Sequence, residues 1–343
     1  MVTKNIFEIL LDKFTPWLKF SPELVHEKQV YLLHLLCLLD EASNNAWQQW
    51  DAFSWKQLNF PNRIGIAGGV DKTGANINNW WQLGAGFVEV GTITPKYQQP
   101  NPGKIIARDQ KNLSLWNKMG FPHPGFEESL WNLEKRLSEK QTPILVNIGK
   151  NRWTPNEKAQ EDYQFLIHEL HSYADIFVVN ISSPNTQGLR DLFKKQNFKP
   201  FIKSIYQTSK EYKKPILLKL SPDENEESFD LIVDLSLEVG FDGFILTNTT
   251  TQRTSELSFP TDGGVSGKFL APFSKLALQR IVKHLGTEKK NKLIINAGGV
   301  FNYEDYLERR QLGADLVQLY SGIVFNGPYI FKKIAREHFL KYN

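Results

Sequence analysis

Three short runs decide the fold of this chain: PILVNI at residues 143–148, IFVVNI at residues 176–181 and PILLKL at residues 215–220. Each run is almost continuously apolar, which is typical of parallel strands that are covered on both faces. Amphipathic stretches with helical spacing, such as Glu226–Glu238, lie between runs of this kind. The full set of eight runs is Arg63–Ala67, Phe87–Val90, Pro143–Ile148, Ile176–Ile181, Pro215–Leu220, Gly243–Leu246, Leu293–Asn296 and Leu316–Leu319. Eight strand–helix alternations predict an α/β fold, a (β/α)8 TIM barrel, rather than an open sheet, which usually has fewer strands.

Length and composition agree with one barrel and a small appendage. A TIM barrel takes about 250 residues, and the chain has 343, of which 41% are hydrophobic. The net charge of +4 comes without a block of Lys and Arg residues, so nucleic acid is not expected as a partner. The single cysteine, Cys37, excludes an intramolecular disulfide and a cysteine-ligated metal cluster. One histidine, His123, falls in a loop that follows a strand, so no metal site is expected either.

Residues 1–45 are predicted to form a helical appendage, followed by the barrel over residues 46–343. Apolar residues recur at helical spacing from Ile6 to Leu18, and Glu23–Leu39 forms a second amphipathic stretch. The leucines of that stretch exceed what one core-facing stripe requires: Leu32, Leu33, Leu35, Leu36 and Leu39. Two interpretations stay open, a cap or dimer contact on the barrel and a hydrophobic cleft that rests on a membrane surface.

The N-terminal region also bears on where the chain is found. Its longest apolar run, Val30–Leu39, is about half as long as a bilayer crossing requires. Charged residues interrupt the first twenty positions, which excludes a secretory signal. We therefore expect the chain to stay on the cytosolic side of a membrane and not to span it.

Polar residues gather where the predicted strands end. In a barrel these carboxyl ends meet on one face, and three long connections, residues 92–125, 182–197 and 248–268, leave from it. Lys219 lies inside an apolar run, where a charge is unfavourable unless something anionic pairs with it. Together with Lys72, it predicts an anionic ligand over the barrel mouth.

Glycine pairs and amides indicate the class of that ligand. Gly298-Gly299 and Ser321-Gly322 follow the last two strands, where such barrels commonly bind phosphate. Neither a P-loop nor a spaced GxGxxG motif is present, so the sequence does not favour ATP or a dinucleotide. Amides and hydroxyls at the rim can donate and accept at once, as a pyrimidine or a flavin requires. They are Asn147, Asn180, Asn185, Asn248, Thr247 and Thr249.

In these residues the sequence resembles the dihydroorotate dehydrogenases, and specifically their membrane-associated, quinone-using class 2, over about residues 21–331. The stretch NISSPNT at residues 180–186, followed by GLR at 188–190, matches the family's catalytic loop. Its second serine is the base in class 2, and a cysteine replaces it in class 1. Further blocks match in the family's order: Gly69–Lys72, Gly91–Pro95, Asn147–Asn151, Thr247–Thr250, Gly263–Gly267 and Gln318–Gly322.

The resemblance implies an activity. It is the oxidation of (S)-dihydroorotate to orotate, the fourth step of de novo pyrimidine (UMP) biosynthesis. Ser183 would be the base and FMN N5 the hydride acceptor, and ubiquinone or menaquinone would reoxidise the flavin. The resemblance further implies a peripheral position on the cytoplasmic face of the bacterial inner membrane.

The resemblance also assigns residues to each ligand. The FMN-binding positions of the family match Ala67, Gly68, Thr92, Asn147, Asn180, Lys219, Thr247, Gly267, Gly299, Tyr320 and Ser321. The substrate positions match Lys72, Asn117, Met119, Gly120, Phe121, Asn180, Asn185, Asn248 and Thr249. The appendage carries Ser21-Pro22-Glu23 and His26, as in the class 2 helix whose tunnel admits quinone, and Arg108 and Tyr320 match positions that flank this tunnel.

The sequence departs from the family pattern at a few positions. Gly68 stands where alanine is usual and Asn296 where a small residue is usual, which would shift the flavin edge slightly. Lys118 and Pro122 change the substrate lid, and Ala107 replaces a bulkier residue beside Arg108 in the tunnel.

Two other functions remain as alternatives. One is another FMN barrel oxidoreductase, such as one that acts on uracil rings, which would normally carry a cysteine in the catalytic loop. The other is a non-catalytic barrel that binds a phosphorylated ligand, which would leave Lys219 and the asparagine rim unexplained.

Overall fold

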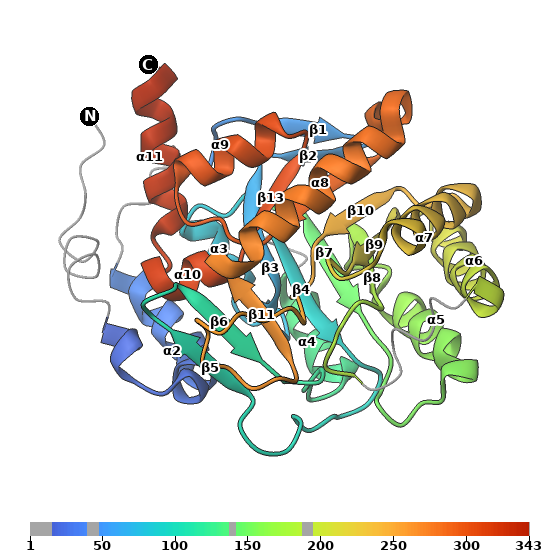
Figure 1. Cartoon of the computed structure of the whole chain (residues 1–343), viewed down its shortest axis with the longest axis horizontal. Coiled ribbons are helices and arrows are strands. Elements are labelled where there is room, and N and C mark those ends of the chain that lie inside the picture. The colour runs from blue at the N-terminus through green and yellow to red at the C-terminus, as the bar shows by residue number, and fades with distance from the viewer. Residues whose placement is uncertain (1–15, 40–47, 137–141, 187–194, 343) are drawn as a thin grey trace.

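The computed structural model describes residues 16–39, 48–136, 142–186 and 195–342. Its centre is a closed barrel of eight strands, in the order β10–β12–β13–β3–β4–β7–β8–β9, and helices surround it (Figure 1). All eight neighbouring pairs are parallel. The barrel strands are β3 (Ile64–Asp71), β4 (Phe87–Ile93), β7 (Ile144–Ile148), β8 (Ile176–Asn180), β9 (Ile216–Leu220), β10 (Gly243–Leu246), β12 (Leu293–Ala297) and β13 (Leu316–Leu319). Each predicted run is a barrel strand, so the predicted (β/α)8 fold is confirmed.

Helices follow the barrel strands in turn. They are α3 (Ile77–Gln82), α4 (Phe126–Arg136), α5 (Ala159–Leu170), α6 (Lys195–Glu211), α7 (Glu226–Val239), α8 (Ala271–Leu285), α9 (Tyr303–Gln311), α10 (Ser321–Asn326) and α11 (Ile330–Tyr342). Short 3-10 turns are η1 (Pro16–Lys19), η4 (Asn156–Lys158), η6 (Lys268–Leu270) and η7 (Gly286–Asn291). The outward side chains of the strands pack with these helices in one large apolar core.

The interior of the barrel changes character along its axis. Near the amino ends of the strands it is apolar, with Phe87, Leu145, Leu217 and Leu316 in one buried cluster. Successive inward positions on a strand are two residues apart. The next inward residues on the same strands are therefore polar: Glu89, Asn147, Lys219 and Gln318. The sequence thus fills the lower barrel with hydrocarbon and places polar groups at the carboxyl ends.

Two small sheets close the ends of the barrel (Figure 1). At the amino end, the hairpin of β1 (Phe53–Trp55) and β2 (Leu58–Phe60) packs Trp55 and Phe60 onto the interior cluster. At the carboxyl end, β5 (Ile106–Asp109), β6 (Ser114–Asn117) and β11 (Gly264–Gly267) form an antiparallel sheet with β6 in the middle. Its strands come from two of the long connections, in which the sequence predicted no strand.

The appendage is described from residue 16 onward, so the predicted helical pattern from Ile6 to Phe14 lies outside the described residues. The second predicted stretch is confirmed as α2 (Pro22–Leu39). This helix lies beside β5 and α3 (Figure 1), and Gln82 Nε2 donates to the carbonyl oxygen of Cys37 at 2.9 Å.

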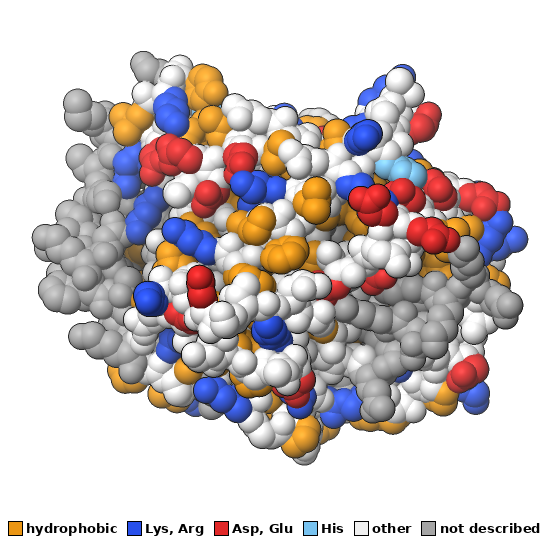
Figure 2. All heavy atoms as spheres, viewed as in Figure 1, with side chains coloured by type: hydrophobic (Ala, Val, Ile, Leu, Met, Phe, Trp, Pro, Cys, Tyr) orange, Lys and Arg blue, Asp and Glu red, His pale blue; other side chains and the backbone are white. Residues whose placement is uncertain are grey.

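The leucines of α2 divide between two faces. Leu33 and Leu36 are buried, whereas Leu32, Leu35 and Leu38 are 38%, 52% and 65% exposed. The surplus of leucine therefore forms an exposed apolar face, and Leu33 and Leu36 belong to the packed face instead. Elsewhere, Figure 2 shows acidic and basic side chains intermixed over the described part of one face.

Candidate functional site

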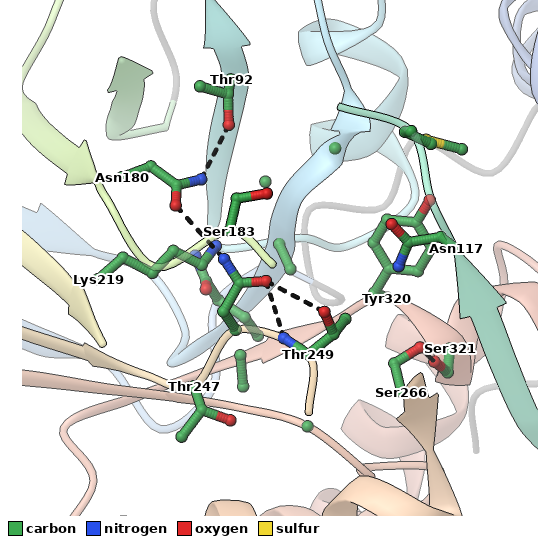
Figure 3. A pocket seen from close by; sticks show the side chains of 18 of the residues that line it. Thr92, Asn117, Asn180, Ser183, Lys219, Thr247, Thr249, Ser266, Tyr320 and Ser321 are labelled. Atoms are coloured by element: carbon green, nitrogen blue, oxygen red, sulfur yellow. Dashed lines mark hydrogen bonds between the residues drawn. The ribbon is translucent and has the colours of Figure 1, made fainter. Parts of the chain in front are cut away.

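A cavity opens at the carboxyl ends of the barrel strands, beneath the sheet of β5, β6 and β11. Figure 3 shows side chains from both the barrel and the small sheet pointing into it. Most of the predicted site residues line this pocket: Ala67, Gly68, Lys72, Thr92, Asn117, Met119, Gly120, Phe121, Asn180, Ser183, Asn185, Lys219, Thr247, Asn248, Thr249, Gly299, Tyr320 and Ser321. Residues far apart in the sequence thus come together because all parallel strands end on one face.

A chain of hydrogen bonds joins the amides along one wall of the pocket (Figure 3). Asn180 Nδ2 donates to Thr92 Oγ1 at 2.9 Å, and Asn248 Nδ2 donates to Asn180 Oδ1 at 3.3 Å. Asn248 Oδ1 in turn accepts from the backbone N–H of Thr249 at 2.8 Å. Each amide therefore has a fixed orientation, so the wall presents defined donors and acceptors before any ligand arrives.

Ser183 lies beside this wall on the loop that follows β8. Its side chain is buried, and its Oγ accepts from the backbone N–H of Asn185 at 3.2 Å. Asn185 Nδ2 donates to Asn117 Oδ1 at 2.8 Å, which ties the loop to β6 of the covering sheet. The Ser183 hydroxyl is thus held in place by its own loop, next to residues that were predicted to bind the substrate, such as Asn185 and Asn117.

Lys72 supplies positive charge to the pocket. Its ammonium has no anionic partner among the described residues, and burial lowers its pKa to about 8. Below it, His123 is buried, and its Nδ1 accepts from the backbone N–H of Gly125 at 3.1 Å. The other ring nitrogen therefore carries the proton and lies 3.1 Å from the Lys72 carbonyl oxygen, and burial lowers the pKa of His123 to about 4. The backbone of Lys72 is thus held by His123, and its ammonium is available to bind an anionic ligand.

Lys219 differs from the expectation made for it. Its ammonium donates to Glu89 Oε1 at 2.9 Å, inside the barrel. A side chain of the protein therefore supplies the anion that this buried charge requires, so Lys219 by itself does not indicate an anionic ligand. Glu89 lies in β4 within an apolar run, so the same argument from a charge in a buried strand could have found it.

Glycines shape the end of the pocket near β12 and β13. Gly298 and Gly299 have φ angles of +124° and +74°, and a Cβ on Gly299 would lie 2.4 Å from the Ala271 Cβ. Across from this turn, the hydroxyls of Ser266 and Ser321 lie 2.9 Å apart (Figure 3). Bare backbone beside two hydroxyls is the environment that suits a phosphate group.

Three predicted residues among those described do not line the pocket. Asn147 lies under it and donates through Nδ2 to Glu89, and Gly267 supports it with a φ of +88° where a Cβ would lie 2.2 Å from the Leu113 carbonyl oxygen. Arg108 donates to the carbonyl oxygens of Trp17 and Phe20, so it holds the appendage against β5. His26 belongs to α2, and its side chain lies outside the described residues.

Tyr320 connects the pocket to the appendage. Its ring lines the pocket and packs against the cluster that contains Leu18, Leu115 and Phe325, and burial raises its pKa to about 12. Apolar contacts therefore run from the appendage to the pocket.

Three residues that the sequence did not assign belong to the site. Ser266 and Gln318 line the pocket, and Glu89 lies beneath it. Gln318 stands at an inward position of a predicted strand, which was a usable signal. Ser266 belongs to β11, which contacts α10 only in the folded chain, so no signal in the sequence pointed to it.

Two of the departures from the family pattern, Asn296 and Ala107, lie elsewhere than expected. Asn296 points out of the barrel and donates to the Leu246 carbonyl oxygen and to Ser274 Oγ, at 2.9 and 3.0 Å, so it does not face the pocket. Ala107 packs with Trp116 and Val265, whereas Leu115, on the other face of the small sheet, packs toward Tyr320. Ala107 therefore does not shape the side that faces the appendage.

The remaining departures lie at or near the pocket. Lys118 pairs with Asp262 at 2.5 Å, and Pro122 lines the pocket. A Cβ on Gly68 would lie 2.4 Å from Glu89 Oε1, so glycine fits this barrel and alanine would require a shift.

None of the helices in the described residues has the length and apolar character of a bilayer-spanning segment. Groups of three or more His, Cys, Asp or Glu side chains arranged to hold a metal ion were not found in the same part of the chain.

Comparison with known proteins gives consistent results. A sequence profile described as "Dihydroorotate dehydrogenase" matches residues 52–339. A protein of Christiangramia forsetii named "Dihydroorotate dehydrogenase (quinone)" is 38% identical over 331 residues, which cover 93% of this chain and 95% of the relative. A protein of the same name from Sulfurimonas denitrificans is 40% identical over 279 residues, 81% of this chain and 77% of the relative.

Solved structures show the same likeness. Ligand-free DHODH from Eimeria tenella superimposes with a TM-score of 0.81 at 31% identity, covering 92% of this chain and 94% of that one. The same enzyme in complex with ferulenol gives a TM-score of 0.83 at 30% identity, covering 94% and 92%.

Proposed function

Because this chain belongs to the dihydroorotate dehydrogenase family and is an oxidoreductase of its quinone-dependent class, we propose a specific reaction for it. It oxidises (S)-dihydroorotate to orotate with bound FMN and a quinone acceptor. The observation that carries the proposal is one pocket that holds an unpaired Lys72, an oriented amide wall and Ser183. A carboxylate-bearing pyrimidine needs a cation, a set of fixed donors and acceptors, and a group that takes a proton.

The residues of the pocket fit FMN. Buried oxygens of Thr247 and Gln318, which line the pocket, have no partner in the described part of the chain, and they suit the N–H edge of an isoalloxazine ring. Lys219 can donate to ring carbonyls, while the turn at Gly298-Gly299 and the hydroxyls of Ser266 and Ser321 suit the phosphate. When bound, FMN supplies an acceptor for a hydride, which no side chain of the protein offers.

The substrate side of the pocket supplies the other steps. Lys72 binds the carboxylate, and Asn117, Asn180, Asn185 and Asn248 hold the ring edges; the Met119-Gly120-Phe121 segment and Thr249 complete the wall. Ser183 takes the proton from C5 as the hydride leaves C6, so both bonds to hydrogen break and the C5=C6 double bond forms. A serine is a weak base, so it depends on placement and on a neighbour that accepts its own proton. Thr186, whose buried Oγ1 has no partner among the described residues, is two positions past Pro184 and suits that relay.

We assign the quinone to the side of the appendage. Phe20, Leu24, Tyr31, Leu32, Leu35 and Leu38 form an exposed apolar surface on and beside α2. We propose that residues 1–45, with His26, Arg108 and Tyr320, form the quinone channel. The apolar surface would rest on the cytoplasmic face of a bacterial inner membrane, from which ubiquinone or menaquinone enters.

The test is a two-step reaction followed by absorption. Purified protein should be yellow with one FMN per chain, dihydroorotate should bleach the flavin, and ubiquinone should restore its colour. A protein without flavin would favour the non-catalytic barrel, and a flavin bleached by a dihydropyrimidine without the carboxylate as fast as by dihydroorotate would contradict the role of Lys72.

A further inference from the structure

Glu89 lies directly beneath the pocket floor. Its side chain is fully buried, while that of Lys219 is 7% exposed and lines the pocket. A Cβ on Gly68 would lie 2.4 Å from Glu89 Oε1, so the carboxylate lies directly behind Gly68, which lines the cavity. Glu89 therefore cannot touch a ligand, yet it lies next to residues that can.

The carboxylate is held from three other strands. Oε1 accepts from Lys219 Nζ of β9 at 2.9 Å and from Asn147 Nδ2 of β7, and Oε2 accepts from Gln318 Nε2 of β13 at 2.5 Å. All three partners are inward-facing residues at one level of the barrel. Any effect of Glu89 on the pocket thus passes through these side chains.

Stability does not explain this ion pair. Replacing a buried pair by well-packed apolar residues is often neutral or stabilising. One inward position lower, the same strands carry Phe87, Leu217 and Leu316, so the barrel is filled with hydrocarbon there. The charges occur only at the level of the pocket, where Lys219 faces the cavity.

We propose that Glu89 is a positioning residue that keeps Lys219 protonated and aimed at the pocket throughout the catalytic cycle. The inference rests on the assignment of Lys219 to FMN in the proposed function. A buried ammonium without a counter-charge gives up its proton as the pH rises. Glu89 supplies that counter-charge at 2.9 Å from the ammonium, inside the barrel.

Besides Lys219, two titratable side chains among the described residues line the pocket. Lys72 follows β3 and titrates near its pKa of about 8, and Tyr320, which precedes α10, titrates only near 12. From β8, β10 and β12 the pocket receives Asn180, Thr247 and Ala297, and Asn147 of β7 lies beneath it; none of these is charged. Among these groups, Lys72 is therefore the one besides Lys219 whose ionisation could change FMN affinity between about pH 6 and pH 9. Variants that are compared with one another must either all keep Lys72 or all lack it.

The experiment measures FMN affinity against pH, by the fluorescence of FMN released from the holoenzyme. Glu89→Gln keeps the shape of the side chain, and Gln318, whose Oε1 has no partner in the described chain, can rotate its amide to accept from it. The matched control is Gln318→Met, which removes a hydrogen bond to the same carboxylate and leaves the ion pair intact. Between about pH 6 and pH 9, FMN affinity of Glu89→Gln should fall about tenfold more than that of the control, the effect of losing one charged hydrogen bond.

Two further variants make the outcome decisive. In Glu89→Gln/Lys219→Met, no titratable group remains at the floor, so the extra pH dependence should vanish. Lys72→Met, which keeps Glu89 and Lys219, should bind FMN equally well across this range. The inference is overturned if the FMN affinity of Glu89→Gln depends on pH in the same way as that of Gln318→Met. It is also overturned if Lys72→Met loses FMN affinity tenfold as the pH rises. A wild-type protein that binds no FMN at all would instead overturn the proposed function.

Discussion

Ser183 has no carboxylate, imidazole or amine bonded to its hydroxyl among the described residues, and one backbone N–H donates to it. Its proposed role as base therefore depends on position. Ser183→Ala should leave FMN and orotate binding near normal, because the loop is also held by Asn185 through Asn117 and Asn101. Flavin bleaching by dihydroorotate should slow by about 10²–10⁴-fold, the usual contribution of a general base.

Stopped-flow bleaching measures this rate directly. Ser183→Cys, which restores a group that can lose a proton, should recover part of it. An unchanged rate in Ser183→Ala would remove this residue from the mechanism.

The lowered pKa of Lys72 leads to a prediction of how orotate binding depends on pH. Burial lowers its pKa to about 8, so in the free site the ammonium loses its proton as the pH rises through 8. Orotate, an anion, should bind with constant affinity below pH 8 and about tenfold more weakly for each pH unit above it. Titration of the flavin spectrum with orotate from about pH 6 to pH 10 measures this.

Lys72→Arg provides the control, since a guanidinium does not lose its proton in this range. Its affinity for orotate should stay constant. Wild-type affinity that is constant up to pH 10 would show that Lys72 is not the group that binds the carboxylate.

At the scale of the element, α2 has two different apolar faces. Charges at Leu33 and Leu36, an obvious choice from the leucine pattern, would disrupt the packed face. Leu32→Glu/Leu35→Glu changes exposed positions only, so the fold should be retained. Flavin reduction by dihydroorotate should be unaffected, while binding to anionic lipid vesicles and reoxidation by long-chain ubiquinone should each fall about tenfold or more.

The matched control for this element is Leu276→Glu on α8, which is 66% exposed and far along the chain from the appendage. It should behave as wild type in all three measurements. Equal losses of reduction and reoxidation in the α2 variant would mean that α2 only supports the barrel, and unchanged reoxidation would place the quinone elsewhere.

At the scale of the whole molecule, buried titratable groups couple stability to pH. Burial holds the pKa of His123 at about 4, below its ordinary value of 6.5. As the pH falls from 6.5 to 4, the unfolded chain takes up a proton at this site before the folded chain does, so stability is lost. Asp71 acts in the opposite direction, because burial raises its pKa to about 6 and the folded chain binds that proton first.

The two effects are separated by a variant at one site. His123→Gln can still donate to the Lys72 carbonyl and accept from Gly125, but it does not titrate. Between pH 7 and pH 5, wild type should lose about 2 kcal/mol more of its free energy of unfolding than His123→Gln, measured by urea denaturation. Equal losses in the two proteins would show that His123 is not held neutral.

The barrel and most of the pocket walls could be predicted from the amino-acid sequence alone. Eight apolar runs alternate with helical patterns, and parallel strands that close into a barrel bring their carboxyl ends to one face. Lys72 follows β3, Asn180 is the last residue of β8, and Ser183 lies three residues further on, so their place in the chain already determines their place in the site. Periodicity and strand order are local properties, which is why they can be read without a structure.

The pairing of side chains from different strands could not be predicted in this way, because it depends on the folded chain. Glu89 and Lys219 are 130 residues apart, and their contact depends on the register across the barrel, which neither strand contains. The same holds for β11 against β6, for Asn296 turned toward α8, and for the separation of Leu33 from Leu32 on α2. Each of these depends on what lies opposite in space, because a side chain's partners are determined by packing and not by its neighbours in the chain.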